Sequence, residues 1–208
     1  EVGPYYAAYI GNTDDREGEG WGNLQYHEYS GRNDIIGARV ARDADNLYFY
    51  VECADTITDP EGASWMNLFI NADCDDATGW YGFDYLINRN RTDSALLVEK
   101  FVGKDTWAFE TVGSVAYTRE GNVMQVKLPK AMIGFGDTMD FKWADNSTPT
   151  GQIMEFLDQG DAAPNARFNY AYRSQQATPT FNSTLDEYLA GGAAFDAGKA
   201  YMAAENGV

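Results

Sequence analysis

The chain has 208 residues, 14% of them aromatic, and a formal net charge of −17. A charge this negative disfavours nucleic acid and anionic lipid surfaces as partners, because both repel a polyanion. The chain has one histidine, His27. A Ser-His-Asp triad would depend on this single N-terminal residue, and a usual four-ligand zinc site needs more ligands than one histidine and two distant cysteines. No run is long and apolar enough for membrane insertion.

Short aromatic and β-branched runs, separated by Gly, Asn and Asp, follow one another along the chain and favour antiparallel β-structure. Residues 1–30 are polar and glycine-rich, which indicates loop. The predicted strands are residues 35–40, 47–54, 65–73, 83–88, 94–102, 107–112, 115–119, 123–128, 141–144 and 168–172. One helical turn is expected over residues 130–133.

Alternation within the strands predicts which side chains face the core. In the strand over residues 47–54 one face carries Leu47, Phe49 and Val51, and the other carries Tyr48, Tyr50 and Glu52. In the next strand, Met66, Leu68 and Ile70 share a face opposite Trp65, Asn67 and Phe69. Trp143 is expected in the core.

Together these strands predict an all-β fold, an antiparallel sandwich of the immunoglobulin-like or jelly-roll-like kind, over residues 1–173. From Ser183 the pattern changes. Ser183 or Thr184 can cap a helix, and the alanine-rich run 193–204 can continue it. We therefore expect residues 174–208 to form a short helical or extended appendage or linker.

Four motifs follow in a fixed order: Asn-Leu-Tyr-Phe at residues 46–49, Leu-Phe-Ile-Asn at 68–71, an acidic turn at 73–79, and Asp-Tyr at 84–85. A later run, 139–145, ends in Asp followed by Asn. This order resembles the family 9 carbohydrate-binding modules, and the wider DOMON-like group of β-sandwiches is similar. The resemblance covers roughly residues 20–172. It implies a β-sandwich that binds glycan without catalysis.

Aromatic residues at strand ends and in turns are the expected sugar platforms, because a ring face attracts the partly positive C–H groups of a pyranose. The candidates are Trp65, Trp80, Tyr81 and Trp107, with Asn67 as a polar contact. Core packing is the alternative for each tryptophan, since this residue is highly buried on average.

The chain departs from the family's pattern at the sugar site. The resemblance implies a glutamate where Asn67 stands and an arginine where Leu86 stands. Trp65 is displaced from the place of the family's first tryptophan, and no tryptophan follows Trp143 to supply the second. Any sugar is therefore expected to be held differently, or by another face of the domain, or not to be bound at all.

The acidic turn contains Asp73, Asp75 and Asp76 before Thr78 and Gly79. Carboxylates at such spacing can converge on calcium, which takes six to eight oxygen ligands. Ala77 stands where an EF-hand has a ligand, and the glycine falls one place late. The alternative is a β-turn stabilised by Asp side chains that bond to the backbone.

Cys53 and Cys74 would lie at opposite ends of a hairpin ladder, so we expect two free thiols. The leading hypothesis is a non-catalytic carbohydrate-binding or accessory module of a larger secreted, periplasmic or cell-surface protein. Its partners would be a poly- or oligosaccharide and other domains of that protein, with calcium as the one cofactor considered.

Three alternatives stay open. The first is a structural spacer or docking domain that contacts its partner through residues 174–208. The second is a haem-binding DOMON-like redox domain, with His27 and one of Met66, Met124, Met139 or Met154 as axial ligands. The third is a glycosidase or lyase, which paired carboxylates allow by inventory alone.

Overall fold

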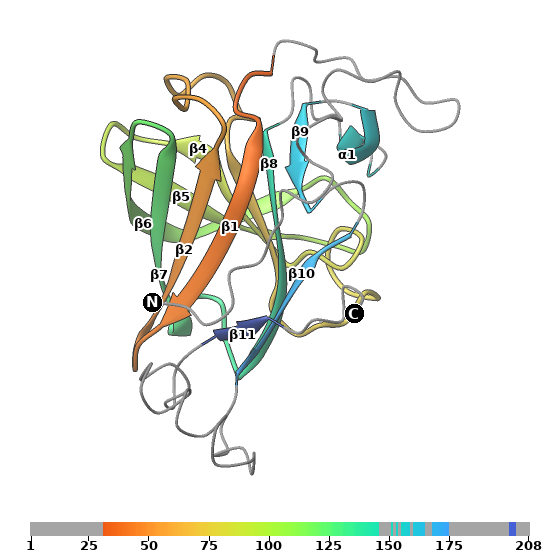
Figure 1. Ribbon diagram of the computed structural model, residues 1–208. Helices are drawn as coiled ribbons and strands as arrows, with labels where there is room; N and C mark the ends of the chain where they lie inside the picture. Colours follow the sequence, from red (N-terminus) through yellow and green to blue (C-terminus); the bar gives the residue numbers. More distant parts are fainter. Residues whose placement is uncertain are drawn as a thin grey trace.

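The computed structural model describes residues 31–145, 151, 153, 155–158, 160–164, 168–174 and 200–202. Its strands are β1 (Ile35–Arg42), β2 (Asn46–Cys53), β3 (Asn67–Asn71), β4 (Tyr85–Arg91), β5 (Ala95–Phe101), β6 (Phe109–Glu120), β7 (Val123–Pro129), β8 (Thr138–Asp145), β9 (Asp161–Ala163), β10 (Tyr170–Ser174) and β11 (Ala200–Met202). Two short helical turns accompany them, the 3₁₀ turn η1 (Lys130–Met132) and α1 (Glu155–Asp158). Figure 1 shows the strands as the dominant feature.

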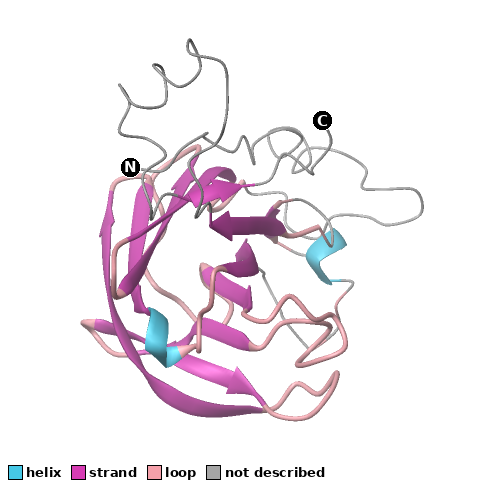
Figure 2. Ribbon diagram, turned by 90° about the horizontal axis from the view of Figure 1, so that it is seen from below, coloured by secondary structure: helices cyan, strands magenta, loops and turns pink. Residues whose placement is uncertain are grey.

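The described strands pair antiparallel in the order β1-β2-β7-β6-β5-β4-β3-β8-β10-β11, and β9 pairs with β8. The first strand, β1, contacts β9 and β11 near the other end of this order. The sheet therefore curls around a common interior into a nearly closed, barrel-like form (Figure 2). This confirms the antiparallel all-β prediction. The two-layer sandwich is not confirmed, because one sheet runs continuously from β1 to β11.

Strand β6 makes the sheet continuous. Its first part, from Phe109 to Ala116, pairs with β5, and its last part, from Tyr117 to Glu120, pairs with β7. We predicted two strands here, and the structure has one of 12 residues. Gly113 marks a register shift rather than a break, since bulges bend strands without ending them. A Cβ at Gly113 would lie 2.9 Å from the Cε of Met132.

The predicted alternation in β2 is confirmed. Leu47, Phe49 and Val51 are fully buried, while Tyr48, Tyr50 and Glu52 are half-buried on the outer face. In β3 all five residues are buried, because both faces of this strand are covered. Leu68 and Ile70 face the main core, as does Trp143 from β8.

A second apolar cluster covers the face of β3 to β6 that points away from the main core. It contains Phe69, Trp80, Phe83, Leu86, Phe101, Ala144, Phe156 and Ala162. Trp107, Phe109 and Ile153 pack against it with part of their surface exposed. Because this cluster is built from aromatic rings in turns as well as strands, it explains why Trp80, a predicted surface aromatic, is buried.

The remaining sequence expectations have mixed outcomes. Cys53 and Cys74 are free thiols, as predicted, and the helical turn before Gly134 is η1. Most of the predicted C-terminal helix lies outside the described residues, and residues 200–202 form strand β11 paired with β10. Among the described residues no helix has the length and apolar character needed to cross a membrane.

Lys142 is a fully buried lysine on β8, directly opposite Phe69 of β3. Its ammonium nitrogen donates to the carbonyl oxygens of Pro164 and Phe168, the latter at 3.0 Å. It also lies 5.1 Å from the ring centroid of Phe156. Burial lowers the pKa of Lys142 to about 7, and the negative charge of Asp161 opposes that shift only in part.

We expect the stability of the protein to rise with pH above about 7 through Lys142. Between this value and the ordinary lysine pKa of about 10.4, the unfolded chain holds a proton that the folded chain has lost, which adds up to about 1.4 kcal/mol per pH unit. Urea denaturation at pH about 7.0 and about 8.5 tests this for the natural chain and Lys142→Met. The natural chain should gain up to about 2 kcal/mol relative to the variant. Parallel pH dependences would contradict the assignment.

Candidate functional site

Three of the predicted sugar contacts, Trp80, Tyr81 and Trp107, come together at the edge of the second cluster. The Trp80 ring lies 5.4 Å from that of Tyr81 and 4.7 Å from that of Trp107, both edge to face. Trp80 is only 2% exposed, so its predicted role as a solvent-facing platform is corrected to a supporting one. Tyr81 is 46% exposed, and Trp107 is half-buried.

Two neighbouring turns hold this surface in place. Tyr81 and Asp105 both have left-handed backbone conformations, with φ of 49° and 50°. The Tyr81 amide donates to Asp105 Oδ1 at 2.9 Å, and the Asp105 amide donates to the Gly79 carbonyl at 2.8 Å. Non-glycine residues in this region cost energy and persist only where the surroundings fix them, often at ligand sites.

We call this surface the aromatic rim. It consists of Tyr81, Trp107 and the exposed polar residues Lys104, Asp105 and Thr106. Behind Trp107 stand Phe109, at 4.9 Å between ring centroids, and Phe101, at 5.6 Å. A ring face flanked by an ammonium, a carboxylate and a hydroxyl group can both stack on a sugar and hydrogen-bond its hydroxyl groups.

The acidic turn adopts the arrangement expected of an Asp-stabilised turn. Asp73 Oδ1 accepts from the Asp75 amide at 2.9 Å, and Asp75 Oδ1 accepts from the Ala77 amide at 2.8 Å. Asp76 Oδ1 is 3.5 Å from the side-chain amide of Asn71. The carboxylates thus bond to nearby N–H groups, and among the described residues no three His, Cys, Asp or Glu side chains gather to hold a metal. Calcium binding stays a prediction.

One further carboxylate lies close to this turn. Asp84 accepts from the Ala72 amide at 2.8 Å and from the Thr78 hydroxyl at 3.1 Å. Burial raises the pKa of Asp84, and the charge of Asp73 raises it further. This carboxyl therefore ties the turn to the residue that follows β3.

Trp65 and Asn67, the two other predicted sugar contacts, lie inside the protein. Trp65 is 1% exposed, and its indole N–H lies 3.1 Å from the Thr58 hydroxyl oxygen. The guanidinium groups of Arg91 and Arg119 lie 5.3 and 6.0 Å from its ring centroid. Asn67 is buried and donates to a backbone carbonyl of the preceding loop. The prediction that Trp65 presents a ring to solvent is therefore wrong.

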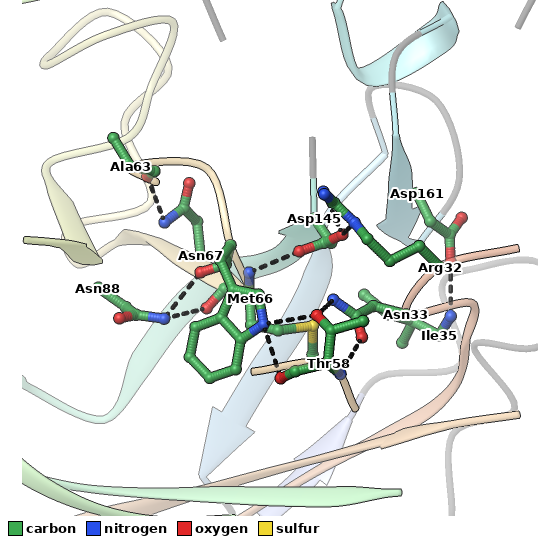
Figure 3. A network of polar contacts seen from close by, with 11 residues as sticks. Arg32, Asn33, Ile35, Thr58, Ala63, Met66, Asn67, Asn88, Asp145 and Asp161 are labelled. Atoms are coloured by element: carbon green, nitrogen blue, oxygen red, sulfur yellow. Dashed lines mark hydrogen bonds and ion pairs between the residues drawn. The ribbon is translucent and has the colours of Figure 1, made fainter. Parts of the chain in front are cut away.

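A buried polar network explains the position of Trp65 (Figure 3). Asp145, at the end of β8, accepts from the Met66 amide at 3.0 Å and from Arg32 Nε at 2.9 Å. The side-chain amide of Asn88 donates to the carbonyls of Trp65 and Met66 at 2.8 and 2.9 Å. These bonds hold Met66 at a φ of 44°, which interrupts the strand alternation before β3 and turns Trp65 into the core.

The outer face of β2 carries aromatic residues that we did not predict as a site. Tyr48 and Tyr50 are half-buried there, beside Arg39 of β1 and Gln125 and Lys127 of β7. A shallow hollow of about 180 Å³ is lined by several of these side chains. The sequence does carry the signal, because the alternation places both tyrosines outward. They were not predicted as a site because only aromatic residues at strand ends and in turns were considered as sugar platforms.

A second hollow, of about 410 Å³, opens beside Thr58 and Arg119. The guanidinium of Arg119 is already engaged. It donates to the carbonyls of Ile57 and Thr58 at 2.7 and 2.6 Å and to Asp59 Oδ1 at 2.6 Å. This arrangement ties the loop after β2 to β6 and uses the guanidinium N–H groups that a ligand would need.

No family model, curated protein or solved structure matches this chain. The likeness to family 9 carbohydrate-binding modules therefore stays a prediction from motifs. The haem alternative stays open as well, because His27 and Met154 lie outside the described residues. Its other candidate ligands, Met66, Met124 and Met139, are fully buried in the core.

Proposed function

We propose that this chain is a non-catalytic carbohydrate-binding module of a larger secreted, periplasmic or cell-surface protein, on an immunoglobulin-like or jelly-roll-like scaffold. The observation that supports it is Tyr81, which exposes 46% of its surface while its backbone is fixed in a strained conformation. A rigid aromatic ring offered to solvent costs little entropy on binding a ligand. Trp107 and the polar residues of the aromatic rim complete the surface.

In this proposal a sugar stacks on Tyr81 and Trp107, and its hydroxyl groups bond to Lys104, Asp105 and Thr106. Each such contact is weak, because the rim is open and the polar groups exchange water for sugar. Binding gains strength when a tethered catalytic domain holds the module close to its polymer, through effective concentration. Calcium at Asp73, Asp75 and Asp76 would stiffen the turn that precedes the rim.

A glycan-array screen of the chain, run in millimolar calcium and repeated with a chelator, tests this function. We expect a group of related sugars to bind, and Tyr81→Ala with Trp107→Ala to weaken the best of them about tenfold, or ~1.4 kcal/mol. Tyr81→Phe is the matched control, since it keeps the ring and should retain binding. Equal binding with and without calcium would remove the ion from the proposal.

A spacer or docking domain is the second candidate. The observation that favours it is Val102, which follows Phe101 and is 47% exposed next to the aromatic rim. Exposed aliphatic surface beside exposed aromatics is also what a domain interface offers. A blank array would favour this candidate, and the rim would then be the contact surface to test.

A further inference from the structure

We propose a second glycan-binding surface on the outer face of β1, β2 and β7, which takes a strand of uncharged polysaccharide. We call it the tyrosine face; it consists of Arg39, Tyr48, Tyr50, Gln125 and Lys127. The inference rests on the proposed function for its class of ligand. It concerns different strands and different residues from the aromatic rim.

The register of the sheet brings these side chains together. Arg39 on β1 and Gln125 on β7 lie directly beside Tyr50, one on each side. Lys127 on β7 lies directly beside Tyr48. Tyr48 and Tyr50 are two positions apart on one strand, and two residues of an antiparallel strand span about 6.8 Å. Their phenol rings therefore follow one another along the strand at about that spacing. Tyr48, Tyr50, Arg39 and Gln125 are among the residues that line the hollow of about 180 Å³.

Hydrogen bonds fix the two phenol rings. The Tyr48 hydroxyl donates to Asp43 Oδ2 at 2.6 Å, and the Tyr50 hydroxyl donates to Glu52 Oε2 at 3.2 Å. Asp43 also accepts from the amides of Asp45 and Asn46, at 2.8 and 2.6 Å, so the acceptor for Tyr48 is itself held in place. Rings fixed before a ligand arrives lose little freedom when it binds.

A cationic side chain lies over the ring of each tyrosine, and a sugar can displace it or accept hydrogen bonds from it. The guanidinium of Arg39 is 5.0 Å from the Tyr50 centroid, and the ammonium of Lys127 is 5.9 Å from the Tyr48 centroid. Such contacts are weak at exposed sites, about 0.5–1 kcal/mol. Once moved aside, both groups and the Gln125 amide become donors to sugar hydroxyl groups.

Charge selects an uncharged polymer. The two cations, Arg39 and Lys127, face the carboxylates of Asp43 and Glu52, which hold the phenol hydroxyls, and the charge of Asp45 also acts on Tyr48. The face therefore has no excess of positive charge, on a chain whose net charge is −17. A polyuronate would meet repulsion from the protein as a whole with no local excess of positive charge to offset it.

Affinity electrophoresis in gels that contain a soluble uncharged β-glucan or a soluble polyuronate tests the inference. We expect the β-glucan to retard the natural chain, and the polyuronate to leave it unretarded. The Tyr48→Ala, Tyr50→Ala double variant should bind the β-glucan about tenfold more weakly. The Tyr48→Phe, Tyr50→Phe double variant keeps both rings but loses the hydroxyl bonds to Asp43 and Glu52 that fix them, so its affinity should fall between those of the alanine variant and the natural chain.

The variants of the two surfaces separate this inference from the proposed function. If Tyr81→Ala with Trp107→Ala abolishes binding while the tyrosine double variant binds fully, the tyrosine face is refuted and the proposed function stands. Retardation by the polyuronate alone also refutes it. If the natural chain binds neither polymer and no glycan on the array, both fail. The thermal unfolding midpoint of each variant confirms that it is folded. Because Tyr48 and Tyr50 are only half-buried, their replacement should leave the protein folded.

Discussion

Replacing Trp80 with alanine is expected to destabilise the protein by about 3–5 kcal/mol, as for a large buried aromatic side chain elsewhere. The indole is 2% exposed and lies between Phe101, at 5.7 Å, and Trp107, at 4.7 Å between ring centroids. Its N–H donates to the Gly151 carbonyl at 3.3 Å. The loss leaves a cavity and an unpaired carbonyl, and urea denaturation at constant pH measures the cost.

Tyr81→Ala is the matched control for this prediction, because Tyr81 is the next residue and nearly half exposed. Tyrosine and alanine are both L-amino acids, so the backbone strain at position 81 is the same before and after the substitution. Its cost should stay within about 1 kcal/mol. Equal costs for the two variants would show that Trp80 is not an interior residue. Trp80→Ala is therefore unsuitable as a probe of sugar binding.

Asp145→Ala is expected to cost about 3 kcal/mol, the lower end of the range for breaking a buried ion pair, because its partner Arg32 is 29% exposed and keeps part of its hydration. Asp145 has no exposed side-chain surface and binds Arg32 at 2.8 Å. It also accepts from the Met66 amide, which then loses its bond inside the protein. Burial raises the pKa of Asp145, and the positive charge of Arg32 lowers it.

Two variants bracket this result in the same denaturation assay. Asp137→Ala removes the half-exposed partner of Arg42 and should cost at most about 1 kcal/mol. Asp145→Asn keeps an oxygen for the Met66 amide while it loses the charge, and its cost should fall between the two alanine variants. If Asp145→Ala were as mild as Asp137→Ala, the network would not hold the loop before β3.

Local pattern predicted much of the scaffold. Alternation in β2 separated buried Phe49 from outward Tyr48 and Tyr50, because neighbouring side chains of a strand point to opposite faces whatever the rest of the chain does. The same reasoning failed at Gly113. A glycine can mark a turn or a bulge, and only the pairing of β5 with β6 decides which.

The candidate site was predicted less well, because the exposure of its aromatic rings depends on residues that are distant in the sequence. Trp80, Tyr81 and Trp107 were singled out as residue types in turns, and they do lie together. Whether each ring meets water depends on residues far away, such as Phe69 and Phe156, which cover Trp80. No local pattern reports such coverage.

The sequence by itself determined the antiparallel all-β class, the strand faces and the presence of an acidic turn, since these depend on neighbouring residues. The tertiary structure decided the curling of one continuous sheet through β6, the burial of Trp65 and Trp80, and the exposure of Tyr81. Asp145 shows why. Its bonds to Arg32 and Met66 join residues 113 and 79 positions apart. The bond to Met66 forms only when β3 pairs with β8, and the bond to Arg32 only when the sheet curls so that the start of β1 meets the end of β8.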